Sequence, residues 1–154
     1  MIQGSCLCGG VRFEVERLVG PFELCHCGRC RRVSSGPCLA AVGVRSDEFH
    51  WLSGRELITR FAMPVREAPP AYSTCFCSVC GTLTPAAELP QGWFEIPLGM
   101  LDGAAGMRPD RHIFTDYAPA WSRGLDALPG CTRAELVALR AAQPPADDPV
   151  GPRR

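Results

Sequence analysis

Hydrophobic and polar residues alternate with a period of two near the start of the chain. Val11, Phe13 and Val15 interleave with charged residues at positions 12, 14 and 16. Because successive side chains of a strand point to opposite faces, this alternation predicts a strand with one buried face.

Further short segments rich in β-branched, aromatic or aliphatic residues follow, bounded by Gly and Pro. Each is long enough to form a strand and too short to form a helix. The strands predicted in this way cover residues 39–44, 49–52, 57–61, 72–77, 93–98 and 112–114. The chain is therefore predicted to fold mainly as β-structure.

One helix is well signalled, close to the end of the chain. Thr132 and Glu135 form a T-x-x-E capping box ahead of Leu136, Val137 and Leu139, and the pattern ends before the prolines at 144 and 145. We therefore expect one domain over residues 1–130, a short C-terminal helix over 131–143 and a tail over 144–154. The tail holds four prolines and a single large apolar residue, which predicts disorder.

Charge and targeting signals narrow the function classes. The 154 residues carry 16 basic and 16 acidic side chains, and every basic residue is Arg. A neutral chain has no long-range field that gathers anionic polymers or lipids, so we expect neither a nucleic-acid nor a membrane partner. The start lacks the pattern of a signal peptide, and no apolar run approaches the roughly 18 residues of a membrane span, which predicts a cytoplasmic protein.

The cysteines are the most informative residues. Eight of the ten fall into three tight groups, with C-x-C at residues 6–8 and C-x-C-x-x-C at 25–30 and 75–80. These spacings suit thiolate ligands of a tetrahedral metal ion. Disulfides between such close cysteines would be strained, and the βαβ pattern around a redox-active C-x-x-C is absent.

Ligand counting separates the cysteines into two zinc sites. A structural site takes four ligands, commonly from two distant segments, and Cys6, Cys8, Cys77 and Cys80 fit this description. The remaining group has three sulfurs, from Cys25, Cys27 and Cys30. Three protein ligands and an open fourth position are typical of a reactive zinc.

The ordered motifs also resemble a known family. They are G-S-C-L-C-G-G-V from residue 4, C-H-C-G-R-C-R from 25, S-S-G from 34, F-C-S-V-C-G from 76, His112-Ile113, Trp121 and D-A-L-P from 126. Over residues 4–129 the chain resembles the glutathione-dependent formaldehyde-activating enzymes, a family that also includes centromere-protein-V-like members. The three cysteine motifs in this order are specific, although one of them alone would not be.

The resemblance implies a fold, a cofactor and a reaction. It implies an Mss4-like, tent-shaped β fold of short antiparallel strands held together by zinc. It implies two Zn2+ sites divided as the ligand count divides them, with Cys25, Cys27 and Cys30 also the catalytic residues. The implied activity is that of a carbon-sulfur lyase, which adds a thiol such as glutathione to formaldehyde and gives S-(hydroxymethyl)glutathione.

Three further cysteines leave alternatives open. Cys38 stands where the family pattern has an apolar residue, and as a fourth ligand it would close the second site and leave a non-enzymatic, zinc-held interaction module. Cys75 makes the third group repeat the spacing of the second, so the structural set could differ by one ligand. Buried thiols also pack like small hydrophobes, and we favour that role for Cys38, Cys75 and Cys131.

The charge of an open three-thiolate site favours one chemistry. Three thiolates leave the zinc complex negative, which makes it a poor device for acidifying water. Such an ion still has affinity for a soft ligand, so a substrate thiol would be held there as the nucleophilic thiolate. Thiol activation is therefore expected in preference to hydrolysis.

Residues near the three-sulfur group have two possible uses each. Arg29, Arg31 and Arg32 either offset its charge and bind substrate carboxylates or form a solvated basic loop. His26 either supplies a fourth zinc ligand or a proton, or points away from the metal, and strand alternation favours the second. For the other neighbours we favour structural roles: a turn after the motif for Ser34 and Ser35, a hydrogen-bonded core position for His112, and core packing for Trp93, Phe94 and Trp121.

Overall fold

The computed structural model of the chain describes residues 1–63, 72–103 and 106–142. The chain forms two compact units, residues 1–121 and 122–154. The first unit contains all the strands described below and the second contains the C-terminal helix. The tail predicted from residue 144 onward lies outside the described residues.

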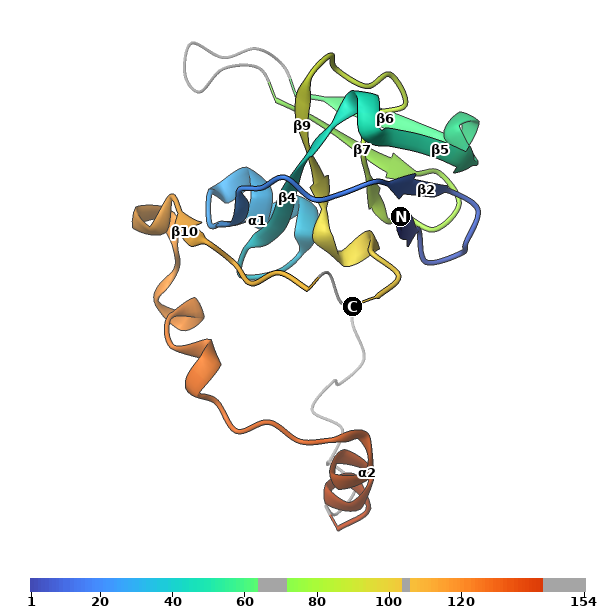
Figure 1. The fold of residues 1–154 in the computed structure, drawn as a ribbon. Helices are drawn as coiled ribbons and strands as arrows, with labels where there is room; N and C mark the ends of the chain where they lie inside the picture. Colours follow the sequence, from blue (N-terminus) through green and yellow to red (C-terminus); the bar gives the residue numbers. More distant parts are fainter. Residues whose placement is uncertain (64–71, 104–105, 143–154) are drawn as a thin grey trace, which may run out of the picture. The chain divides into compact units, whose positions relative to one another are not determined.

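Three small sheets make up the first unit (Figure 1). One sheet is antiparallel, with the order β1 (Ile2–Ser5), β2 (Arg12–Val15) and β5 (Phe49–Ser53). A second antiparallel sheet consists of β6 (Ile58–Ala62), β7 (Ser73–Cys77) and β8 (Leu83–Thr84). The predicted mainly β fold of short antiparallel strands is confirmed.

The largest sheet has four strands in the order β10 (Arg111–Ile113), β3 (Phe22–Cys25), β4 (Leu39–Arg45) and β9 (Trp93–Pro97). Figure 1 shows β4 and β9 side by side, and their register pairs Val42 with Ile96 and Val44 with Phe94. β10 departs from the antiparallel rule, because it pairs with β3 in parallel and places Ile113 opposite Cys25. Two segments far apart in the sequence therefore meet where the second cysteine motif begins.

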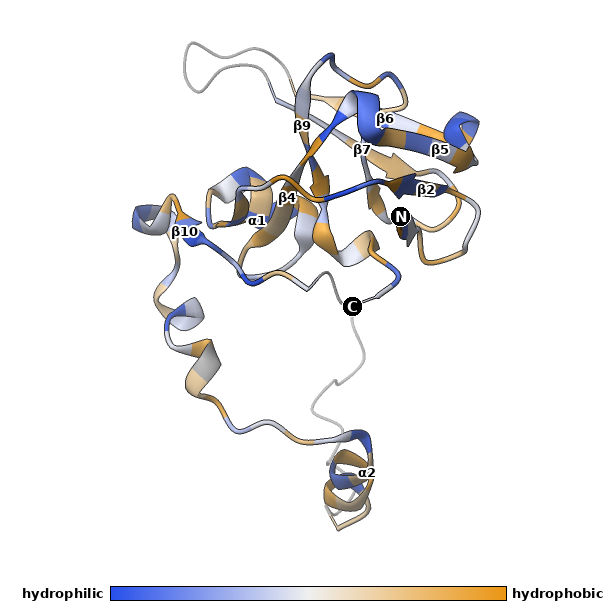
Figure 2. Cartoon of the chain, in the orientation of Figure 1, coloured by the Kyte–Doolittle hydropathy of each residue, from blue (hydrophilic) through white to orange (hydrophobic). Residues whose placement is uncertain are grey.

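The core lies between the four-stranded sheet and the β1–β2–β5 sheet. Phe13 stacks on Phe49 with ring centroids 4.9 Å apart, and Phe49 meets Phe94 at 5.4 Å. Aromatic pairs of this kind contribute about 0.5–1.5 kcal/mol each beyond the burial of their area. In Figure 2, β4 is among the strongly hydrophobic segments, as expected for a strand that contributes Val42 and Val44 to the core.

The prediction of core packing is confirmed for Phe94 and was wrong for Trp93 and Trp121. Trp93 is 48% exposed and Trp121 is 63% exposed. Trp93 is adjacent to Phe94 in β9, so its side chain points to the opposite face of the sheet, where its indole Nε1 donates a hydrogen bond to the Gly20 carbonyl at 2.9 Å. The sequence did not show which of two neighbouring aromatics faces the core.

The described part of the chain contains two α-helices. The predicted C-terminal helix is α2 (Arg133–Ala142), and its capping box is formed in both directions: Glu135 N donates to Thr132 Oγ1 at 3.3 Å, and Thr132 N donates to Glu135 Oε2 at 2.6 Å. A second helix, α1 (Gly28–Ser34), was not predicted. Short 3-10 turns lie at Ser46–Glu48, Arg55–Leu57, Leu98–Met100, Thr115–Tyr117, Ala120–Ser122 and Leu125–Ala127.

The strands that the sequence missed are short or poor in β-forming residues. β1 contains Gly and Ser, β3 has only four residues including Glu23, and β8 has two residues. Their pairing with neighbouring strands compensates for weak intrinsic preference.

In the part of the chain that is described, no helix has the length and apolar character needed to cross a membrane.

Candidate metal centres

The first thiol group joins two distant loops. Cys6 and Cys8 lie between β1 and β2, whereas Cys77 ends β7 and Cys80 lies in the turn before β8. The four Sγ atoms lie within 4.8 Å of one another, with 3.4 Å between Cys6 and Cys8 and 3.9 Å between Cys8 and Cys77. Tetrahedral zinc with Zn–S bonds of about 2.3 Å separates its sulfurs by roughly 3.8 Å. The predicted four-thiol group is therefore brought together and could hold one metal ion.

Matching turns position the sulfurs of this group. Gly9 N donates to the Cys6 carbonyl at 2.8 Å, and Gly81 N donates to the Cys77 carbonyl at 2.8 Å. Gly9 has a φ of +73° and Gly81 a φ of +74°. Residues other than Gly rarely adopt this left-handed region of φ, so glycine in each motif permits the tight turn.

Thr82 connects the two loops, and the sequence analysis missed it. Its Oγ1 accepts a hydrogen bond from Leu7 N at 3.1 Å and lies within hydrogen-bond distance of Cys80 Sγ, at 3.3 Å. This hydrogen bond and one from the Thr82 backbone lower the pKa of Cys80 to about 5. A hydroxyl residue directly after the C-S-V-C-G motif was the signal that could have identified this second contact to a thiolate.

The second thiol group is local. Cys25 ends β3, Cys27 caps the N-terminus of α1, and Cys30 lies in the first turn of that helix. Their three Sγ atoms also lie within 4.8 Å of one another. The C-x-x-C spacing that predicted a turn is thus the start of a helix, which brings the Cys30 backbone N–H to 3.4 Å from Cys27 Sγ.

Burial and hydrogen bonds act against each other on the thiols of this group. Burial is the strongest influence on Cys27 and raises its pKa, but hydrogen bonds from the Cys30 backbone N–H and from the neighbouring thiols lower the value to about 7. Burial and the two neighbouring thiols raise the pKa of Cys30 far above its ordinary value. Cys27 is therefore the thiol of the group that ionises most readily.

The three other cysteines stand apart from both groups. Among the described residues, no fourth histidine, cysteine or carboxylate joins Cys25, Cys27 and Cys30, and neither Cys38 nor Cys75 belongs to a thiol group. Cys75 is 7% exposed, as expected for a packed thiol, and burial raises its pKa. Cys131 is exposed, so its predicted packing role was wrong.

The His26 ring contacts His112, and among the described residues it does not join the three-thiol group. It is buried, and its Nε2 lies 2.8 Å from His112 Nδ1. The parallel pairing of β10 with β3 brings the two rings together, because His112 lies opposite Leu24 in that register. His112 is hydrogen-bonded as expected but exposed rather than in the core.

The arginines and serines of the motif hold its loop together. Arg31 Nε donates to the His26 carbonyl at 3.2 Å, and Arg32 Nη1 donates to the Gly28 carbonyl at 2.9 Å. Ser35 ends α1 with a left-handed backbone, and Ser34 Oγ donates to the Cys38 carbonyl at 3.0 Å. The predicted turn role of the serines is confirmed, and two of the arginines bind their own loop.

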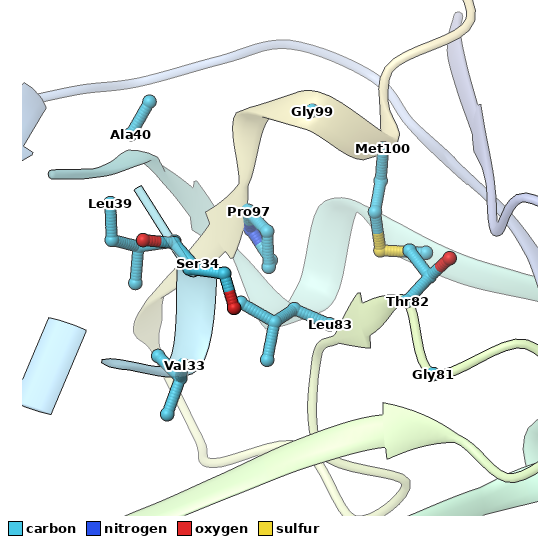
Figure 3. Close-up of a pocket in the computed structure, with 11 residues that line it drawn as sticks. Val33, Ser34, Leu39, Ala40, Gly81, Thr82, Leu83, Pro97, Gly99 and Met100 are labelled. Carbon is cyan, nitrogen blue, oxygen red and sulfur yellow. The ribbon is translucent and has the colours of Figure 1, made fainter. Parts of the chain in front are cut away.

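A cavity of about 500 Å3 is lined by segments that follow both thiol groups. In Figure 3, Val33 and Ser34 project from α1 at one end, and Thr82 and Met100 lie at the other end. The described residues that line it include no charged side chain, so it suits an apolar group better than an anion.

A second cavity, of about 270 Å3, includes Cys30 in its wall. Tyr72, Thr84 and Glu95 also line it. Leu39, Leu83 and Pro97 line both cavities and so form a wall common to the two. Tyr72 and Glu95 carried no functional signal in the sequence, because each lies far from the cysteine motif that it approaches in the fold.

Comparison with known proteins places the chain in a family. The family model described as glutathione-dependent formaldehyde-activating enzyme matches residues 1–117. No curated protein matches the chain. A crystal structure of a Rhodobacter sphaeroides protein is similar at 27% sequence identity, covering 66% of this chain and 89% of that one, with a TM-score of 0.49. The match to the family model covers most of the sequence and includes both thiol groups, and the chain therefore belongs to the glutathione-dependent formaldehyde-activating enzyme family.

Proposed function

We propose that this chain is a zinc-dependent carbon-sulfur lyase that joins a thiol such as glutathione to formaldehyde or a similar small aldehyde. Cys6, Cys8, Cys77 and Cys80 hold a structural Zn2+ ion in this proposal. Cys25, Cys27 and Cys30 hold the second ion and are the catalytic residues. The reaction takes place in the cytoplasm, where thiols stay reduced.

The donor atoms of both groups fit zinc. Each group consists of thiols alone, and the Sγ atoms of each lie within 4.8 Å of one another. Thiolate sulfur is a soft ligand that suits zinc, whereas Ca2+ and Mg2+ take oxygen ligands. The two groups also differ in ligand number in the way that structural and catalytic zinc sites differ.

One observation carries the proposal: the three-thiol group adjoins a cavity, because Cys30 forms part of the wall of the 270 Å3 space. A substrate there would lie next to the thiols, with the side chains of Leu39 and Pro97 reducing its contact with water. Holding two reactants together in this way removes much of the entropy cost of a bimolecular addition.

The chemistry follows from the sulfur ligands. Zinc bound by three thiolates has affinity for a further sulfur and supplies a substrate thiol in its thiolate form. In the net reaction, the sulfur–carbon bond forms, the carbonyl π bond breaks, and the thiol proton ends on the carbonyl oxygen. Arg31 and Arg32 support the site by holding the carbonyls of His26 and Gly28, which keeps the loop that carries the thiols in place.

The decisive experiment measures the rate of S-(hydroxymethyl)glutathione formation by NMR exchange spectroscopy, since the addition also proceeds without a catalyst. Zinc-loaded protein is expected to accelerate it, and Cys30→Ser is expected to abolish the acceleration. Cys75→Ser is the matched control, because Cys75 lines the same cavity but belongs to neither thiol group. Equal rates with and without the wild-type protein would overturn the proposal.

X-ray absorption at the zinc edge distinguishes the enzyme from a zinc-held interaction module. The proposal expects seven protein sulfurs shared between two ions, four on one and three on the other. Two ions with four protein sulfurs each would support the module instead.

A further inference from the structure

The cavity beside Cys30 contains a group that the proposed chemistry does not yet use. Adding a thiolate to a carbonyl places negative charge on the carbonyl oxygen, and a fixed hydrogen-bond donor at that oxygen is a main source of rate enhancement in such reactions. The residues with a side-chain hydroxyl in the cavity wall are Tyr72, Ser73, Thr74 and Thr84, and the hydroxyl of Thr84 is itself buried. A phenol is more acidic than an aliphatic alcohol, so Tyr72 is the strongest oxygen donor among them.

Tyr72 and Cys30 line the same cavity, so the tyrosine and one thiol of the three-thiol group border one space. Burial is the largest influence on the phenol and raises its pKa. An ordinary phenol already has a pKa of about 10, so the hydroxyl stays protonated across the physiological range and remains a donor.

Arg29 orients the Tyr72 ring. Its guanidinium carbon lies 4.8 Å from the ring centroid, within the range of a cation–π contact. Arg29 belongs to the same helix as Cys30, so the ring is tied to the element that carries the thiol. Within the described residues, no other tyrosine lines either cavity.

We propose that Tyr72 is a catalytic residue that donates a hydrogen bond to the carbonyl oxygen of the aldehyde while the substrate sulfur attacks its carbon. The sulfur–carbon bond forms as the carbonyl π bond breaks, and the electron pair moves to the oxygen that Tyr72 holds. The proton lost by the substrate thiol, passed through solvent, completes the hydroxyl group of the product, so Tyr72 is unchanged. This inference rests on the proposed function and adds the group that stabilises the oxygen.

Tyr72→Phe tests the inference, because it removes only the hydroxyl and keeps the ring beside Arg29. The catalysed rate constant at saturating glutathione is expected to fall about 10²-fold, the loss typical of a missing donor at a developing oxyanion. The zinc content and the glutathione dissociation constant, measured by isothermal titration calorimetry on zinc-loaded protein, should not change. Tyr117→Phe is the matched control, since the chain has two tyrosines and Tyr117 is 60% exposed in a 3-10 turn.

The outcomes separate this inference from the proposed function. Acceleration by the wild type with an unchanged rate in Tyr72→Phe would overturn the role of Tyr72 and leave the lyase proposal standing. Loss of zinc or of glutathione binding in Tyr72→Phe would also overturn it, because the ring hydroxyl would then support the site instead of the reaction. A wild type that does not accelerate the addition would overturn both.

Discussion

The two thiol groups use the same ligand chemistry in opposite settings. The four-thiol group joins loops whose cysteines, such as Cys8 and Cys77, are 69 residues apart. The three-thiol group lies within one six-residue segment at the start of α1. Two of the four thiols, Cys6 and Cys77, belong to the hydrophobic core, while Cys8 is exposed and Cys80 half-buried. The thiols of the three-thiol group are all half-buried, and none belongs to that core.

This difference separates stability from reactivity. A metal that joins distant segments restricts the unfolded chain strongly, so its binding free energy is largely folding free energy. A metal held by one short segment closes almost no loop and contributes little in this way. The group that joins distant loops therefore suits a structural role, and the local group beside a cavity suits a reaction.

The largest expected effect is unfolding of Cys77→Ser. Structural zinc binding contributes about 10–16 kcal/mol in small zinc domains, which matches or exceeds the roughly 5–15 kcal/mol total stability of a typical domain. Circular dichroism and NMR peak dispersion should show a disordered chain. Cys75→Ser, two residues earlier in β7, is the control and should stay folded; a folded, zinc-replete Cys77→Ser would remove the contrast between the two groups.

Cys25→Ser should abolish activity and leave the fold. Its expected signature is a zinc-to-protein ratio that falls from two to one by elemental analysis, with a cooperative thermal transition retained. The physical reason is that the remaining ion still joins the two distant loops. Equal losses of stability in Cys25→Ser and Cys77→Ser would argue against separate roles.

Thr82→Val sharpens the comparison at the four-thiol group. The change removes the hydroxyl that forms a hydrogen bond with Cys80 Sγ and accepts one from Leu7 N, while it keeps the shape of the side chain. Loss of such a second contact to a metal ligand lowers metal affinity about 10–100-fold. Competition with a chromophoric chelator measures this affinity. The control is Thr84→Val, which is expected to bind zinc normally because the buried Thr84 hydroxyl has no hydrogen-bond partner among the residues that the structure describes.

Glu95→Gln should have the smallest effect, a rise in Tm of about 1–2 °C at pH 7. Although part of Glu95 reaches solvent, burial of its carboxyl and then the charge of Glu23 raise its pKa above 4.5. A carboxyl with a raised folded-state pKa stabilises the fold while protonated and loses that stabilisation as pH rises through the folded pKa. The difference in Tm between Glu95→Gln and the wild type should therefore disappear near pH 4. Glu88 is an exposed glutamate paired with Arg55, and Glu88→Gln is the control that should not raise the Tm.

Part of the fold could be predicted because local patterns were strong. The alternation around Phe13 and the capping box of Thr132 and Glu135 act within a few residues, and both elements formed as expected. β3 and α1 could not be predicted, since Glu23 weakens one pattern and a seven-residue helix inside a cysteine motif has no hydrophobic period. The exposure of Trp93 could not be predicted either, because strand alternation allows either Trp93 or Phe94 to face the core.

The sequence by itself determined which cysteines of one segment can meet, because spacings of two and three residues bring their sulfurs close, but only the structure left Cys38 and Cys75 outside both groups. The sequence also determined, through the order of the motifs, the family to which the chain belongs. Only the tertiary structure decided what surrounds each group. Thr82 reaches across to Leu7, His112 pairs with His26, and Tyr72 lines the cavity of Cys30 because sheets built from distant strands pack together, and no local pattern encodes those contacts.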